Sequence, residues 1–223
     1  MTPWELLDSS EVAGEAEKLT LSRRGDEYSI KTGYSELMNS RMHGSEDTLA
    51  VLGCKKLKNK AKARVLIGGL GMGFTLAEAL KHVGDDAEVV VAELVAAVIK
   101  WNQTHLSHLA GHPLKDKRVS VHQGDVGKLI RAEKNGFDAI LLDVDNGPEG
   151  LTRKENSALY SPNGLKVSKA ALRLNGVFAV WSAFPEPRFT KRMQQAGFKT
   201  EEIPCRAHGK RGSKHMIWLG ECR

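Results

Sequence analysis

Apolar and polar positions follow two different patterns along the chain. Over residues 19–31 they alternate with a period of two around a glycine turn, which is typical of a β-hairpin with one buried face. Leu37 and Met38 predict a third short strand, and Ser45, followed by acidic residues, predicts the N-cap and first turn of a helix. From residue 64 onward unbroken apolar runs replace the alternation, which indicates strands buried on both faces.

These apolar runs alternate with helix-forming segments. The sequence predicts strands over 64–68, 88–93, 118–122, 137–143 and 176–181, with a helix after each of them. Two further apolar runs, 198–203 and 215–219, predict a terminal antiparallel hairpin. The alternation predicts an α/β fold with a mostly parallel, doubly wound sheet. We therefore divide the chain into an N-terminal β-hairpin segment with a helix (1–60) and a Rossmann-like domain (61–223), joined by a basic linker.

A glycine-rich turn follows the first buried strand. Gly69, Gly71 and Gly73 stand where a strand passes into a helix, and glycine backbone can approach a nucleotide closely there. The spacing is not the dinucleotide fingerprint, because Phe74 occupies its last glycine position. The turn therefore suits an adenosine nucleoside without a pyrophosphate, and the alternative is a tight turn that binds no ligand.

Three predicted strands end in an acidic residue at the edge where such sheets bind ligands. Glu93 lies about twenty residues past the glycine turn, where a carboxylate accepts ribose hydroxyls. Asp125 can accept a hydrogen bond from the exocyclic amine of adenine, and Asp143 ends the fourth strand. Each acid alone is more often a helix N-cap. Together with the glycine turn they indicate an adenosine-type ligand.

Composition narrows the class of protein. The chain has 223 residues, 41% hydrophobic and 27% charged, with a formal net charge of +6, which is typical of a soluble globular protein. No apolar run approaches the roughly 20 residues of a membrane span, and no signal peptide is expected. Three scattered cysteines predict a reducing cytoplasm without disulfides or zinc. We expect no metal site, and His105, His108 and His112 to be surface residues.

Several motifs together resemble the spermidine synthase-like branch of the S-adenosylmethionine-dependent methyltransferase fold. The resemblance rests on the glycine loop at 65–76, Ala92-Glu-Leu94, Gln123-Gly-Asp125, the loop Asp143–Pro148 and Leu159-Tyr-Ser161. It implies a seven-stranded, Rossmann-like sheet whose last strand is antiparallel, with a small N-terminal β segment over the active site. It also implies a homodimer.

The motifs and the resemblance name the candidate site residues. Those expected to bind S-adenosylmethionine, or its decarboxylated form, are Gly69, Leu70, Gly71, Gly73, Glu93, Leu94, Gly124, Asp125, Val126 and Asp143. Asp143 is also the expected catalytic residue, which accepts a proton from the nucleophile or orients it. A small-molecule acceptor is expected to contact Glu36, Asp145, Asn146, Tyr160 and Trp181.

The chain departs from the pattern of the family at three positions. Met72 stands where the family has an aspartate that holds the aminopropyl amine of the donor, and Asn146 replaces a second aspartate that helps to bind the diamine. Glu36 stands in place of a glutamine in the hairpin. A polyamine needs paired carboxylates, because an unpaired buried ammonium is expensive. Our leading hypothesis is therefore an S-adenosylmethionine-dependent methyltransferase that acts on a small-molecule amine or hydroxyl.

Two alternatives stay open. The first is aminopropyl transfer from decarboxylated S-adenosylmethionine to a diamine such as putrescine, in which Asp143 deprotonates the amine and Asp145, Glu149 and Glu36 compensate in part. The second is an RNA methyltransferase or nucleic-acid-binding module that uses the basic loop 206–214, with salt-dependent affinity. Such loops are usually only solvated, so nucleic acid is not favoured, and no membrane partner is expected.

Overall fold

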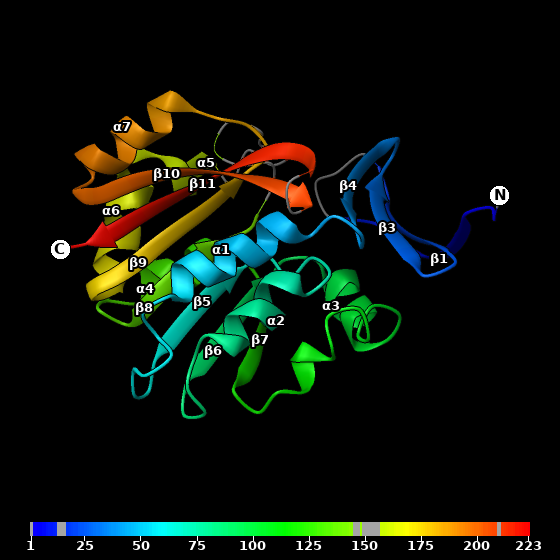
Figure 1. Ribbon diagram of the computed structural model, residues 1–223, viewed down its shortest axis with the longest axis horizontal. Coiled ribbons are helices and arrows are strands. Elements are labelled where there is room, and N and C mark those ends of the chain that lie inside the picture. The colour runs from blue at the N-terminus through cyan, green and yellow to red at the C-terminus, as the bar shows by residue number, and fades with distance from the viewer. Residues whose placement is uncertain (1, 13–16, 145–147, 149–156, 209–210) are drawn as a thin grey trace.

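Two β-sheets organise the protein (Figure 1). The computed structural model describes the chain except for residues 1, 13–16, 145–147, 149–156 and 209–210. The small sheet is antiparallel, in the order β1-β2-β3-β4, and its strands are β1 (Glu5–Ser10), β2 (Leu19–Arg24), β3 (Glu27–Thr32) and β4 (Ser35–Asn39). In Figure 1 it lies at one end of the large sheet.

The large sheet has seven strands in the order β10-β11-β9-β8-β5-β6-β7. They are β5 (Arg64–Gly68), β6 (Glu88–Glu93), β7 (Val119–Gln123), β8 (Phe137–Leu142), β9 (Leu172–Ser182), β10 (Phe198–His208) and β11 (Arg211–Cys222). β11 runs antiparallel to both of its neighbours, and the other pairs are parallel. The predicted α/β fold with an antiparallel last strand is confirmed.

Helices cover both faces of the large sheet. They are α1 (Gly44–Cys54), α2 (Phe74–Lys81), α3 (Ala96–Gln103), α4 (Val126–Ala132), α5 (Ser157–Tyr160), α6 (Pro162–Ala171) and α7 (Pro187–Gln195), with a short 3-10 helix, η1 (Pro113–Lys115). In β5, Val65 and Ile67 pack in the core beneath α1, α2 and α3, whereas Leu66 packs in the core beneath α4, α6 and α7. The central strands are buried on both faces, which is why their sequences are apolar without alternation. Among the described residues, no helix combines the length and apolar character needed to cross a bilayer.

The start of α1 differs from the prediction. His43 is the N-cap, and it makes no side-chain capping hydrogen bond. Ser45 lies inside the first turn, fully buried, and its hydroxyl donates to the carboxylate of Glu46 at 2.6 Å. The prediction of Ser45 as the N-cap is therefore wrong, because its hydroxyl bonds to a side chain instead of to the free N–H groups of the helix.

The small sheet is fastened against the end of the large one. Trp101 Nε1 of α3 donates to Asp8 Oδ2 of β1 at 2.9 Å. Further along, Met38 of β4 lies over the glycine turn, since a Cβ at Gly71 would be 3.3 Å from its sulfur. The small sheet thus covers the ends of β5 and β6, where the candidate site lies.

Candidate active site

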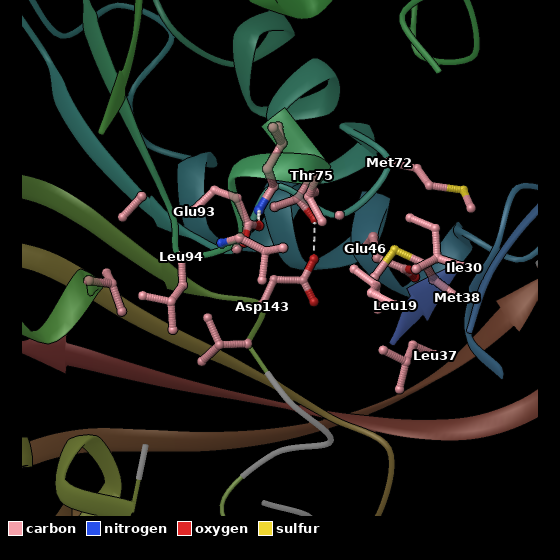
Figure 2. Close-up of a pocket in the computed structure, with 18 of the residues that line it drawn as sticks. Leu19, Ile30, Leu37, Met38, Glu46, Met72, Thr75, Glu93, Leu94 and Asp143 are labelled. Atoms are coloured by element: carbon pink, nitrogen blue, oxygen red, sulfur yellow. Dashed lines mark hydrogen bonds between the residues drawn. The ribbon is translucent and has the colours of Figure 1, made fainter. Parts of the chain in front are cut away.

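A cavity of about 260 Å³ lies between the small sheet and the carboxyl ends of the large sheet's strands. Its floor comes from the ends of β5, β6 and β8 and the start of α2, and its roof from the small sheet (Figure 2). The roof is largely apolar and includes Leu19, Ile30, Leu37 and Met38. The crevice predicted at the strand ends is thus closed on one side by the N-terminal segment.

The glycine turn exposes backbone to the cavity. Gly69 and Gly71 have φ angles of 89° and 52°, which favour glycine. A Cβ at Gly69 would also lie 2.2 Å from the carbonyl oxygen of Asp143. Gly73, with a φ of 86°, is the N-cap of α2 and faces Asn102, outside the cavity lining. Gly69 and Gly71 therefore present bare backbone to the cavity, and Gly73 starts the helix.

Glu93 lies at the end of β6 and is 8% exposed. Its carboxylate accepts the N–H of Leu70 at 3.0 Å and the N–H of Val95 at 2.8 Å. Burial raises the pKa of Glu93, and these backbone hydrogen bonds oppose that rise. The carboxylate also lines the cavity, where it can accept hydroxyls of a ribose.

Asp125 has two contacts of its own besides lining the cavity. It is the N-cap of α4 and accepts the N–H of Gly127 at 2.8 Å, and its other oxygen lies 3.2 Å from Arg131. Gly124 and Val126 beside it also line the cavity. The capping interaction fixes the carboxylate where it can meet the edge of a base.

Two carboxyl groups from different elements line the same cavity, those of Asp143 and Glu46. Asp143 follows β8 and accepts a hydrogen bond from Thr75 Oγ1 at 2.6 Å (Figure 2). Glu46 enters from the first turn of α1. Burial raises the pKa of Asp143 to about 6, and burial together with the charge of Asp143 raises the pKa of Glu46 to about 7. Near pH 7 this acid pair therefore holds about half a proton, most of it on Glu46.

The charge of the cavity has one sign. Its described lining contains four carboxyl groups, those of Glu46, Glu93, Asp125 and Asp143, and no lysine, arginine or histidine. Such a lining attracts cationic ligands and opposes anionic ones.

The structure brings most of the predicted residues together. Those that line the cavity are Gly69, Leu70, Gly71, Glu93, Leu94, Gly124, Asp125, Val126, Asp143 and Trp181. Glu36 is outside the lining and accepts a hydrogen bond from Ser29 at 2.5 Å. Tyr160 is buried in the core, edge-on to Phe189. Asp145 and Asn146 lie outside the described residues.

Sequence reasoning missed Glu46 as a site residue. In the sequence it is one of two acids in the first turn of a helix, and such acids ordinarily favour the helix dipole. It lines the same cavity as Asp143 only because α1 packs across the sheet beside α2, and no local pattern indicates that packing. Thr75 was missed for the same reason, since its partner lies 68 positions away.

The sheet order, with β11 antiparallel between β9 and β10, defines a class I S-adenosylmethionine-dependent methyltransferase-like fold. The model of the spermine/spermidine synthase domain matches residues 42–196, more than half of the chain. The chain belongs to this family, which confirms the resemblance seen in the motifs.

Individual relatives agree with the family match. The chain is 30% identical over 126 residues to a polyamine aminopropyltransferase of Prochlorococcus marinus subsp. pastoris, covering 56% of this chain and 42% of that protein. It is 35% identical over 80 residues to one of Clostridium tetani, covering 36% of this chain and 28% of that protein. The matches thus span less than half the length of these curated relatives. The crystal structure of spermidine synthase from Thermotoga maritima has a TM-score of 0.76 at 17% identity, covering 98% of this chain and 73% of that one.

These comparisons correct the leading hypothesis. The preference for methyl transfer is wrong, because the matching family is that of spermine and spermidine synthases and the relatives are named for aminopropyl transfer. That preference rested on the carboxylates missing at Met72 and Asn146. It took no account of Glu46, which only the folded chain brings into the cavity.

Proposed function

We propose that the protein transfers the aminopropyl group of decarboxylated S-adenosylmethionine to a primary amine of a diamine. One observation carries this proposal: the described cavity lining holds four carboxyl groups and no cationic side chain. S-adenosylmethionine carries a carboxylate on its alkyl chain, which the acid pair would oppose and which no described side chain of the lining would pair. The decarboxylated form carries only the ammonium and the sulfonium, and both are attracted.

The adenosine part of the donor suits the end of the cavity that is lined by Gly69, Gly71 and Glu93. The bare backbone at Gly69 and Gly71 leaves room for the nucleoside, and Glu93 would accept its ribose hydroxyls. Asp125 would accept the adenine amine, a role that its helix-capping contact leaves open. This arrangement directs the alkyl chain of the donor towards the acid pair.

The reaction needs a base and a dry, aligned site. The amine nitrogen attacks the carbon beside the sulfonium; the C–N bond forms, the C–S bond breaks, and its electron pair remains on sulfur as methylthioadenosine. The attacking nitrogen loses a proton to Asp143, which Thr75 holds in place. A pKa of about 6 lets Asp143 be ionised at neutral pH yet accept a proton readily.

Glu46 would replace the carboxylate that the family has at the position of Met72. Met72 replaces the aspartate that holds the donor amine in the family, but Glu46 approaches the same cavity from α1 and would pair that ammonium. The apolar roof, including Leu19 and Ile30, would pack against the methylene chain of the diamine. The cavity would thus offer Asp143 to the attacking amine and Glu46 to the ammonium of the donor.

Calorimetry with two donors tests the proposal. The decarboxylated donor should bind at least about tenfold more tightly than S-adenosylmethionine, the equivalent of about 1.4 kcal/mol. Incubation with that donor and putrescine should give methylthioadenosine and a triamine by mass spectrometry, with cadaverine and butylamine as comparison acceptors. Equal binding of both donors, or no methylthioadenosine with any amine, would refute the proposal.

A further inference from the structure

A chain of hydrogen bonds leads out of the cavity from the acid pair. Ser45 Oγ donates to Glu46 Oε2 at 2.6 Å, and His215 Nδ1 of β11 lies 2.9 Å from the same hydroxyl oxygen. Ser45 is fully buried, His215 is partly exposed, and neither lines the cavity. The chain therefore connects a carboxyl group inside the cavity to a ring at the protein surface.

The hydroxyl permits only two arrangements, because it has a single proton. When Glu46 is ionised, Ser45 donates to it and must accept from the N–H at His215 Nδ1. When Glu46 is protonated, its O–H can donate to Ser45, which then donates to a bare His215 Nδ1. Switching between these arrangements moves one proton across the serine.

We propose that Ser45 and His215 form a proton exit for the acid pair. The inference rests on the proposed aminopropyl transfer, which leaves one proton on Asp143 in each turnover. When the products leave, water in the cavity carries that proton to Glu46, the carboxyl group with the higher pKa. With His215 protonated on Nε2 and bare on Nδ1, the Glu46 O–H bond then breaks as a new Ser45 O–H bond forms, and the former Ser45 proton moves to His215 Nδ1. The imidazolium releases the proton from Nε2 to water, which leaves the ring protonated on Nδ1. A turn of the partly exposed ring away from Ser45 lets water take the Nδ1 proton and return one to Nε2, so that a bare Nδ1 faces Ser45 again.

The surroundings of His215 suit this role. The ring lies edge-on to Trp181, at 4.8 Å between centroids, and opposite Cys205 in the β10–β11 register. Burial lowers the pKa of His215, so the ring is neutral and able to accept a proton at neutral pH. Burial and the charge of Glu46 raise the pKa of the Cys205 thiol to about 11, so that group does not titrate in this range.

One substitution separates proton transfer from a purely structural role, in which the Ser45–His215 hydrogen bond only holds β11 against α1. In His215→Asn the amide nitrogen takes the place of Nδ1, so it can still donate to Ser45 but cannot carry a proton. We expect kcat to fall about tenfold or more, with the donor KM unchanged. Added imidazole should restore turnover in His215→Ala. The matched control is Glu88→Gln, which removes an acid at the start of β6, paired with Arg64 and outside the cavity lining.

A second readout does not depend on turnover. In NMR titrations of the free protein, the His215 ring resonances should show an extra step as Glu46 ionises, and Ser45→Ala should remove it while thermal melting confirms folding. A wild-type kcat and pH profile in His215→Asn, or the absence of the extra step, would overturn the proton exit. A wild-type protein that shows the step but makes no methylthioadenosine would instead count against the proposed function.

Discussion

Replacing Glu46 by glutamine should weaken donor binding in a way that depends on pH. The substitution keeps the shape of the side chain and its hydrogen bond to Ser45 but removes the negative charge. At pH 8 the native Glu46, whose pKa is about 7, is mostly ionised and able to pair an ammonium. The variant lacks that charge at every pH.

The size of the effect follows from the structure. A hydrogen bond to a charged group contributes about 1.5–3 kcal/mol, so the dissociation constant at pH 8 should rise about 10- to 150-fold. At pH 6 a carboxyl with a pKa of about 7 is only about one-tenth ionised, so the native protein itself binds about tenfold more weakly. The ratio between variant and native affinities should therefore shrink about tenfold between pH 8 and pH 6.

Titration calorimetry over pH 6–8, in buffers of different ionisation enthalpy, measures both the affinity and the protons released. Near pH 7 the native protein should release about half a proton from Glu46 on binding, and the variant should lose this release. Glu88→Gln, which removes a surface acid paired with Arg64 outside the cavity lining, should behave like the native protein. A loss in Glu46→Gln that is the same at both ends of the range, or no loss at pH 8, would refute the pairing of Glu46 with the donor.

The remaining predictions concern the stability of the protein and the glycine turn. Gly69→Ala should abolish donor binding and unfold at markedly lower denaturant, because its Cβ would meet a backbone oxygen at 2.2 Å; Gly25→Ala, with φ also positive but open space around it, should cost only about 1 kcal/mol. Asp138→Asn should lower the free energy of unfolding by about 3 kcal/mol, since this buried carboxylate pairs with a lysine and an arginine, and calorimetric donor binding should not change. The free energy of unfolding of the native protein should fall as pH rises from about 4.5 to about 7, because the raised pKa of Glu46 keeps a proton that the unfolded chain releases; a flat profile in the native protein, or the same slope in Glu46→Gln, would contradict this.

Local patterns in the sequence were enough to predict the sheet. The strand β6 spans the predicted residues, since an unbroken run of β-branched residues is typical of a strand that is buried on both faces. The position of Glu93 also followed from the sequence, because the distance from a glycine turn to the next strand end is set by one strand–helix–strand unit. The bounds of β6 and the position of Glu93 depend only on residues that are close in the sequence.

The chemistry of the acid pair depends on packing between distant segments. Glu46 and Asp143 are nearly a hundred positions apart, and only the course of α1 across the sheet brings them into one cavity. Tyr160 illustrates the same limit: it belongs to the expected substrate pocket, but the folded chain packs it against Phe189 in the core. An aromatic residue after a loop carries no local sign of which side it will face.

The position of β11 in the sheet has a consequence for how the protein opens. β10 is an edge strand, and β11 is its sole neighbour in the described sheet. Any fluctuation that frees β11 must also release β10 and bare the edge of β9, a surface prone to pairing with other chains. Amide protons in β10 should therefore never exchange more slowly than the best protected ones in β11.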